Sequence, residues 1–245
     1  MDWTDHAIIL AARKHGENNA IVHLLTRTRG RHAGLVRGGS GRRLRGVLQP
    51  GNEVAATWRA RLEEHLGHLT VELEHARAAP LLEDPLRLAA LTSACALCEV
   101  ALPEREPHLA AYDGFDALLV ALDDDQPDWP QHYVHWELTL LADLGFGLDF
   151  SACAATGSTT DLVYVSPKSG RAVSASAGAP YRDRLLPLPA FLLRQPAGVP
   201  FDRLEIRRGL QLTGFFLAEH VLRPQNIAVP AARYRLVDRF GAETH

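Results

Sequence analysis

Short apolar segments separated by glycine-rich or polar turns fill the first 75 residues, and this pattern predicts β-strands. The segment over residues 65–74 alternates most clearly, with Leu69, Val71 and Leu73 predicted on one face. Residues 20–26 are almost wholly apolar, which is typical of a strand buried on both faces. Five strands are predicted in this way, over residues 7–12, 20–26, 32–37, 53–61 and 65–74.

From residue 80 onward the apolar residues recur at the helical period instead. Asp84 followed by Pro85 is a helix-start signal, because aspartate caps free amide groups and proline suits the first helical position. A polar, glycine-containing stretch with one candidate strand, residues 161–166, interrupts the helical part. Four helices are predicted, over residues 85–102, 108–122, 130–144 and 201–223.

These patterns predict an α+β protein of two domains. The first, residues 1–79, is a β-barrel of five short strands joined by glycine-rich turns, and the OB-fold is the small barrel that this arrangement suits. The second, residues 80–245, is mostly helical and carries a small irregular insert at about residues 151–185.

The composition predicts a globular protein of the cytoplasm. Of the 245 residues, 47% are hydrophobic and 22% are charged, which is ordinary for such proteins. No apolar run approaches the roughly 18 residues that span a bilayer, and the first residues do not read as a secretory signal. Three cysteines argue against a disulfide framework and for a reducing compartment.

The formal net charge of −3 conceals a strong division of charge along the chain. Residues 1–80 carry a net charge of +4, residues 81–150 of −12, and residues 151–245 of +5. Such segregation predicts separate surfaces for separate partners. The acidic middle segment is expected to repel nucleic acid as surely as the first domain attracts it.

The basic charge of the first domain is concentrated between residues 27 and 45, in a stretch with five glycines and no acidic residue. Its seven arginines are Arg27, Arg29, Arg31, Arg37, Arg42, Arg43 and Arg45. Guanidinium groups this close repel one another, so we expect a flexible, solvated loop whose arginines bind the phosphates and bases of DNA or RNA. The alternative is a solvated basic loop without a ligand.

No motif in the chain requires catalysis or a bound metal. Cys95 and Cys98 have CxxC spacing, but they fall within a leucine-rich helical pattern and are expected to be buried structural side chains. His132 and His135 lie three residues apart without the HExxH pattern of a zinc site. P-loop and nucleophile-elbow motifs are missing as well. We therefore predict a protein that is not an enzyme, with no catalytic residues and no cofactor.

Two rival functions stay open at this point. An RNA-binding or translation-associated OB-fold protein would carry the same basic loop, so composition does not exclude it. A hydrolase within the helical domain is the weaker rival, because the sequence offers no nucleophile–base or metal constellation.

Five segments carry a resemblance to a known family. Four lie in the strand-rich part: residues 15–17 (HGE), 21–26 (IVHLLT), 34–38 (GLVRG) and 48–51 (LQPG). The fifth, residues 136–146, contains Trp136-Glu137-Leu138 and ends with Leu144-Gly145-Phe146. By the order and spacing of these segments, the chain resembles the RecO family of bacterial recombination mediators along essentially its whole length.

The resemblance implies an N-terminal OB-fold that binds single- and double-stranded DNA and anneals complementary strands during DNA repair at the nucleoid. It also implies partnership with RecR and with the C-terminal tail of single-strand-binding protein, and through them with RecA. That tail is acidic and aromatic, so its groove should be apolar with a cationic rim. Because residues 81–150 are acidic, its cations are expected from the last segment, with Arg182, Arg184 and Arg207 as candidates.

One departure from the family concerns zinc. Many relatives bind zinc in the insert through four cysteines, arranged as CxxC followed later by two more. Here Cys153 is the single cysteine of the insert, Thr156 takes the second position, and residues 164–171 contain none. The insert is therefore predicted to be a degenerate, zinc-free version that holds itself by packing and backbone hydrogen bonds.

Overall fold

The computed structural model describes residues 1–62, 64–124, 127–193 and 201–241, and the chain forms two compact units. The first unit comprises Met1–Asp123 and Pro230–Leu236. The second comprises Asp124–Val229 and Val237–His245. Within the described residues, no helix combines the length and the apolar character needed to cross a membrane.

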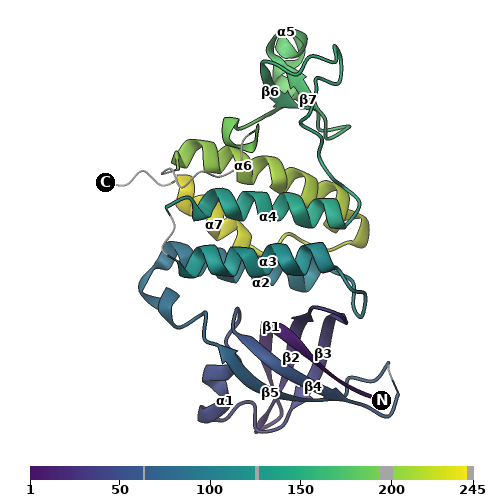
Figure 1. Ribbon diagram of the computed structural model, residues 1–245, viewed down its shortest axis with the longest axis vertical. Helices are drawn as coiled ribbons and strands as arrows, with labels where there is room; N and C mark the ends of the chain where they lie inside the picture. Colours follow the sequence, from purple (N-terminus) through teal and green to yellow (C-terminus); the bar gives the residue numbers. More distant parts are fainter. Residues whose placement is uncertain (63, 125–126, 194–200, 242–245) are drawn as a thin grey trace. The chain divides into compact units, whose positions relative to one another are not determined.

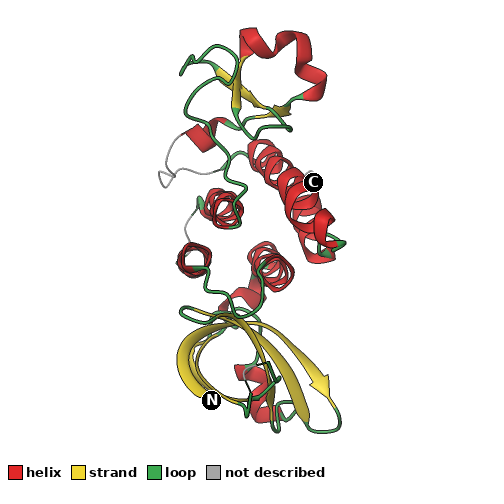
Figure 2. Cartoon of the chain, turned by 90° about the vertical axis from the view of Figure 1, so that its right-hand side faces the viewer, coloured by secondary structure: helices red, strands yellow, loops and turns green. Residues whose placement is uncertain are grey.

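Five strands of the first unit close into a barrel in the order β1-β2-β3-β5-β4, and Figure 2 shows them wrapped around its interior. They are β1 (Asp2–His15), β2 (Asn19–Thr26), β3 (Gly30–Val36), β4 (Glu53–Arg59) and β5 (His68–His75). A six-residue helix, α1 (Arg42–Val47), connects β3 to β4. This strand order is that of an OB-fold, which confirms the predicted α+β class and the barrel.

β1 closes the barrel because it is long enough to pair with two neighbouring strands, β4 and β2. Its first half pairs with β4, from Asp2 opposite Arg59 to Ile8 opposite Glu53, and its second half pairs with β2 as far as His15. A register shift between Ile9 and Ala11 marks the bend between the two halves. The sequence predicted only residues 7–12 because the rest of β1 is polar and solvent-exposed, and its ladder hydrogen bonds leave no hydrophobic signal.

Alternation along the strands builds the barrel core. Ala7 and Ile9 of β1 point inward and join a cluster of buried side chains from all five strands. Ile8 and Leu10 point outward yet are also buried, because helix α2 packs against β1 on that side. This double burial accounts for the continuous apolar run that the sequence shows there. On β5 the predicted face of Leu69, Val71 and Leu73 is buried at the first two positions, whereas Leu73, near the end of the strand, is 44% exposed.

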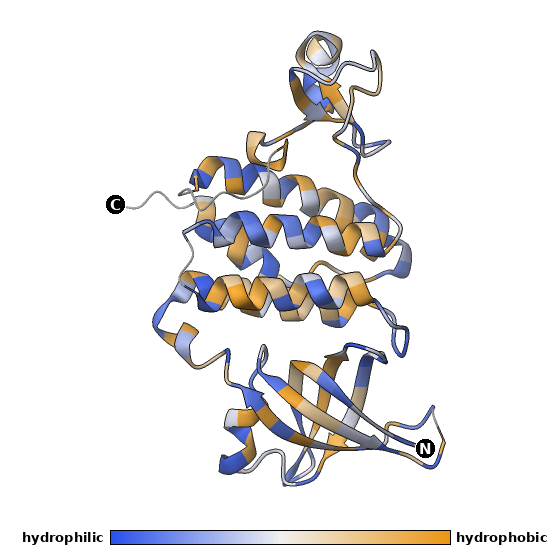
Figure 3. Cartoon of the chain, in the orientation of Figure 1, coloured by the Kyte–Doolittle hydropathy of each residue, from blue (hydrophilic) through white to orange (hydrophobic). Residues whose placement is uncertain are grey.

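Two helices of the first unit lie along one side of the barrel, and α1 lies at one end of it (Figures 1 and 3). They are α2 (Pro85–Ala101) and α3 (Leu109–Asp123), preceded by the short helix η1 (Pro80–Glu83). The predicted cap of α2 is confirmed, since the Asp84 carboxylate accepts from the backbone N–H groups of Leu86 and Arg87 at 2.9 and 3.1 Å. Cys95 and Cys98 are fully buried in α2, and burial raises the pKa of both thiols.

The connection between α2 and α3 fills a gap in the barrel wall. β3 pairs with β5 only where Leu35 lies opposite His68, so the first half of β3 has an open edge. Along that edge the Arg105 N–H donates to the Arg31 carbonyl at 2.8 Å. The Arg105 guanidinium reaches on to the His65 carbonyl at 3.1 Å. Gly30 makes this approach possible, because a Cβ there would lie 1.9 Å from the Glu106 carbonyl oxygen.

The second unit contains α4 (Trp129–Asp143) and α6 (Arg203–Phe216), both close to their predicted bounds (Figure 1). Buried Glu137 of α4 and Thr213 of α6 are hydrogen-bonded side chain to side chain. α6 continues as a π-helical turn, η4 (Leu217–Leu222), and a 3₁₀ turn, η5 (Arg223–Gln225). The last helix, α7 (Ala231–Gly241), was not predicted and contributes residues to both units.

The insert of the second unit is a small folded element rather than an irregular loop. Three short strands form a sheet in the order β7-β6-β8, and three short helices accompany it. Their bounds are β6 (Leu162–Val165), β7 (Ala172–Ser174), α5 (Ala175–Gly178), η2 (Ala179–Arg184), β8 (Leu186–Pro187) and η3 (Ala190–Leu193). The candidate strand at residues 161–166 is confirmed as β6.

The approach of the α2–α3 connection to β3 can be tested with two glycines that share a positive φ. Gly30 (φ +69°) faces Glu106, whereas a Cβ on Gly16 (φ +61°) would meet no atom within 4 Å. Gly16→Ala should cost about 1 kcal/mol of unfolding free energy, from backbone strain alone. Gly30→Ala should cost about 3 kcal/mol or more, because the connection must also move. Equal losses in urea unfolding would contradict this packing.

Candidate nucleic-acid interface

The seven predicted arginines fall into two groups at opposite ends of β3. Arg27 and Arg29 occupy the β2–β3 turn and Arg31 the start of β3. The second group lies beyond the end of β3 and in α1: Arg37, Arg42, Arg43 and Arg45. The groups are about 20 Å apart, since each strand residue advances roughly 3.3 Å. The strand predicted over residues 32–37 is confirmed as β3, and it divides the arginine-rich stretch of residues 27–45, so these arginines do not lie in one flexible loop.

Carboxylates of the first unit already engage the first group. The Arg31 side chain is 15% exposed, donates to the Leu102 carbonyl at 2.8 Å and pairs with Glu104 at 3.1 Å. Arg27 pairs with Asp113 at 3.2 Å, with both side chains about half exposed. Arg29 is exposed and forms no ion pair within the described residues. Arg31 is thus a structural residue, and Arg27 is partly neutralised.

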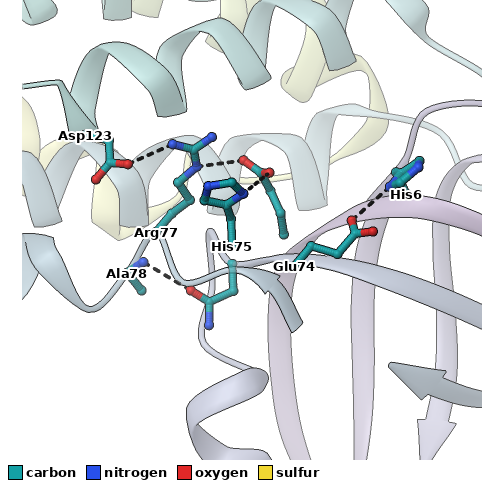
Figure 4. A network of polar contacts seen from close by, with 8 residues as sticks. His6, Glu74, His75, Arg77, Ala78 and Asp123 are labelled. Carbon is teal, nitrogen blue, oxygen red and sulfur yellow. Dashed lines mark hydrogen bonds and ion pairs between the residues drawn. The ribbon is translucent and has the colours of Figure 1, made fainter. Parts of the chain in front are cut away.

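Arginines elsewhere on the barrel are engaged in the same way. Arg77 donates to Glu53 at 2.7 Å and to Asp123 of α3 at 2.8 Å, at the centre of the network in Figure 4. Arg13 of β1 pairs with Glu99 of α2. Four carboxylates of the α2–α3 region therefore face barrel guanidinium groups: Glu99, Glu104, Asp113 and Asp123. The prediction that the acidic segment forms a separate surface is wrong for these four residues.

The second group has a different environment. Arg37, Arg42, Arg43 and Arg45 are all exposed, and none forms an ion pair within the described part of the chain. α1 is short, with Leu44 and Val47 packed against the barrel core and the arginines left toward solvent. The sequence predicts a loop here. A helix of six residues with two apolar side chains is too short to show a helical period. Three guanidinium groups are thus concentrated on α1, and that of Arg37 follows the end of β3.

Backbone hydrogen bonds tie the segments that carry these arginines to two other connections of the barrel. The Ser40 N–H donates to the Asn18 carbonyl at 3.1 Å, which ties α1 to the β1–β2 hairpin. The Leu35 N–H donates to the Gly67 carbonyl at 3.0 Å, which ties the end of β3 to the β4–β5 connection. We call this region the basic end of the barrel. Its basic residues are Lys14, Arg37, Arg42, Arg43, Arg45 and Arg59.

Sequence reasoning missed Lys14 and Arg59, because only barrel closure brings them beside α1. Lys14 and Arg45 line one pocket, and Arg37 and Arg59 line another. Asp2 lies 3.8 Å from Arg59, but both side chains are at least 70% exposed, so water screens this pair. Among the described residues, the same loops also carry Glu17 and Glu64. Cationic side chains nevertheless outnumber acidic ones at this end.

A stack of three rings supports the basic end from within. The ring of His32 lies 4.9 Å from that of Trp3 and 5.3 Å from that of Trp58. The Trp58 indole N–H donates to the Leu66 carbonyl at 3.0 Å and so fixes the β4–β5 connection. Burial, assisted by the charge of Arg105, lowers the pKa of His32 to about 4. The stack therefore contains a neutral imidazole near pH 7.

The insert does not fit the zinc site of the wider family. Cys153 is buried, and its sulfur accepts from the Ser174 backbone N–H at 3.3 Å. Thr156 and Gly157 complete the turn, with Gly157 at φ +73°. Within the described residues, no group of three or more His, Cys, Asp or Glu side chains could hold a metal ion. Backbone hydrogen bonds close this turn, since the Gly157 N–H donates to the Cys153 carbonyl at 2.8 Å and the Cys153 N–H donates to the Ser158 carbonyl at 2.7 Å.

The three arginines suggested for a partner tail lie on separate elements of the second unit. Arg182 and Arg184 belong to η2 of the insert, and Arg207 belongs to α6, all three exposed. A different cation lines an aromatic pocket of about 210 Å³ in that unit. Lys168 lies there with Phe146, Phe216 and His220, the last two with rings stacked 5.4 Å apart.

A closed five-strand barrel followed by helices defines an OB-fold protein, and the basic end of its barrel is a candidate surface for a polyanion. Family models described as Recombination protein O N terminal and Recombination protein O C terminal match residues 1–77 and 82–226. The chain belongs to the RecO family of DNA repair and recombination proteins.

Relatives match along nearly the whole chain. The DNA repair protein RecO of Rhodospirillum centenum is 59% identical over 242 residues, covering 98% of this chain and 95% of that protein. The DNA repair protein RecO of Rhodospirillum rubrum is 55% identical over 243 residues, covering 98% and 96%. That of Afipia carboxidovorans is 53% identical over 234 residues, covering 95% and 93%.

Two neighbouring arginines test the division between structural and solvent-facing groups. Arg31→Met should lower the free energy of unfolding by about 1–2 kcal/mol, because the Leu102 carbonyl and Glu104 lose their shared donor. Arg29→Met should change it by less than about 0.5 kcal/mol, as expected for an exposed side chain. Urea unfolding of both variants measures the difference. A fully stable Arg31→Met variant would return Arg31 to the candidates for ligand binding.

Proposed function

We propose that this protein binds single- and double-stranded DNA at the basic end of its barrel and anneals complementary strands. The observation that carries the proposal is the concentration of Arg42, Arg43 and Arg45 on α1, with Arg37 just beyond the end of β3, without carboxylate partners within the described residues. Of the seven arginines predicted to bind DNA, these four are the ones proposed here. Arg29 and Arg27 are secondary contacts, and Arg31 is left out because its donors are occupied.

The chemistry of the basic end suits annealing without catalysis. Two complementary strands repel each other through their phosphates, and exposed guanidinium groups neutralise this charge while releasing counterions. Guanidinium forks bind phosphate oxygens in pairs, and their flat faces stack on unpaired bases. Gly38 at φ +68° and Gly41 shape the turn that leads into α1, so the backbone can approach a strand closely. Holding two strands side by side is then sufficient for the activity.

The wider role proposed follows from the family. With RecR, the protein would help to load RecA onto single strands coated by single-strand-binding protein, at the nucleoid. The pocket of Lys168, Phe146 and Phe216 supports reception of that protein's acidic, aromatic tail better than Arg182, Arg184 or Arg207, since it combines aromatic walls with a cation. The division into a DNA-binding domain over residues 1–79 and a helical domain over residues 80–245 is part of this proposal.

Salt dependence tests the assignment of the basic end. Neutralising about four phosphates of a single strand should give a slope near −3 for log affinity against log salt. Replacing Arg37, Arg42, Arg43 and Arg45 together by Gln should bring the slope close to zero. The control replaces Arg182, Arg184, Arg207 and Arg239, exposed residues of the second unit, by Gln, which removes the same charge elsewhere. Equal losses in the two variants would mean that net charge alone governs binding, contrary to the proposal.

Strand annealing tests the function with the same proteins. The unaltered protein should accelerate annealing of complementary strands, both bare and coated by the cognate single-strand-binding protein, and the basic-end variant should not. Competition by RNA of the same sequence separates this function from the RNA-binding rival, which predicts that RNA competes better than DNA. Annealing that persists in the basic-end variant would refute the proposed site.

A further inference from the structure

A pocket of about 390 Å³ opens at the basic end, between α1, the end of β3 and the start of β5. Its floor is the barrel core itself, since Val36, Leu69 and Val71 line it and are only 3%, 3% and 8% exposed. Leu35 and Leu44 add apolar walls. An opening that reaches the barrel core gives a flat, largely apolar group a large contact area.

The rim of this pocket is cationic and polar. Arg37, Arg59 and His68 stand at it, together with the hydroxyl-bearing side chain of Thr70. None of its lining residues is acidic. The chemistry is therefore apolar within and positive around the mouth, and α1 adds the charges of Arg42 and Arg43 nearby. Such a site complements a group with flat apolar faces that is carried on a negatively charged chain.

We propose that this pocket receives one unpaired base of a bound single strand, an inference that rests on the proposed DNA binding. A nucleobase has apolar faces and polar edges, and the phosphates on either side of it would meet the arginines of the rim. A base within a duplex is stacked and paired, so it enters only if it is flipped out at a cost. The pocket therefore gives a preference for single strands that charge alone does not provide.

The contribution of the pocket can be isolated by comparing two strands with the same backbone. One is a thymidine oligonucleotide of about 16 nucleotides, the upper end of the site size of one OB-fold. The other is an abasic strand of equal length, which keeps the phosphates and lacks every base. The unaltered protein should bind the thymidine strand about tenfold more tightly than the abasic strand, as expected for a base buried against side chains.

Two matched variants assign this ratio to the pocket. Thr70→Trp places a large side chain at the mouth, from an exposed position on β5. Thr4→Trp makes the same change at an exposed position on β1, two strands from Thr70 and outside the residues that line the pocket. The ratio should fall several-fold in Thr70→Trp and stay unchanged in Thr4→Trp. Leu44→Trp, which fills the pocket from α1, is the second variant if Thr70→Trp does not fold.

The outcomes separate this inference from the function on which it rests. Salt-dependent binding with equal affinity for both strands leaves the proposed function standing and overturns the base pocket. The same ratio in Thr70→Trp and Thr4→Trp also overturns it. Loss of a bound acidic, phenylalanine-ended peptide in Thr70→Trp, without a difference between the strands, assigns the pocket to a protein partner instead. Failure of the unaltered protein to bind either strand contradicts the proposed function itself.

Discussion

The pairing of barrel guanidinium groups with carboxylates of the α2–α3 region is the interaction on which the rest of the first unit depends. Arg31 joins β3 to the α2–α3 connection, and Arg77 joins the end of the barrel to α3. The side chains of Arg31 and Arg77 are only 15% and 13% exposed. Because water screens such shielded ion pairs weakly, breaking either pair is expected to destabilise the unit. These pairs fix the helices on one side of the barrel and decide which arginines remain for a ligand.

This pairing changes the meaning of the charge pattern. The strongly acidic segment is not simply a surface that repels nucleic acid, because four of its carboxylates are occupied by barrel arginines. Arg37, which follows β3, lies about 20 Å from Arg31 at the start of that strand, more than two Debye lengths at physiological salt. The carboxylates around Arg31 therefore have little influence on Arg37. The first unit therefore has two kinds of surface. Beside α2 and α3 its arginines are paired with carboxylates, and beside α1 its arginines are exposed without ion pairs among the described residues.

The sequence predicted the barrel, α2, α4 and α6 because their apolar residues follow a clear period and their ends carry signals such as Asp84-Pro85. It did not predict α1, since Leu44 and Val47 are its only core contacts, nor the polar first residues of β1. Only part of the candidate site could be predicted from the sequence. Clustering in sequence found the arginines, but strand β3 separates Arg31 from Arg37, and only closure of the barrel brings Arg59 beside α1.

Hydrogen–deuterium exchange of the whole chain, with and without a single-stranded oligonucleotide, tests the central claim most directly. It reports every region at once and needs no substitution. The account predicts that DNA slows exchange in residues 37–48 and in the adjoining loops near residues 14–19 and 60–67, with little change at residues 27–31. Protection confined to residues 27–31, or to the helical second unit, would contradict it.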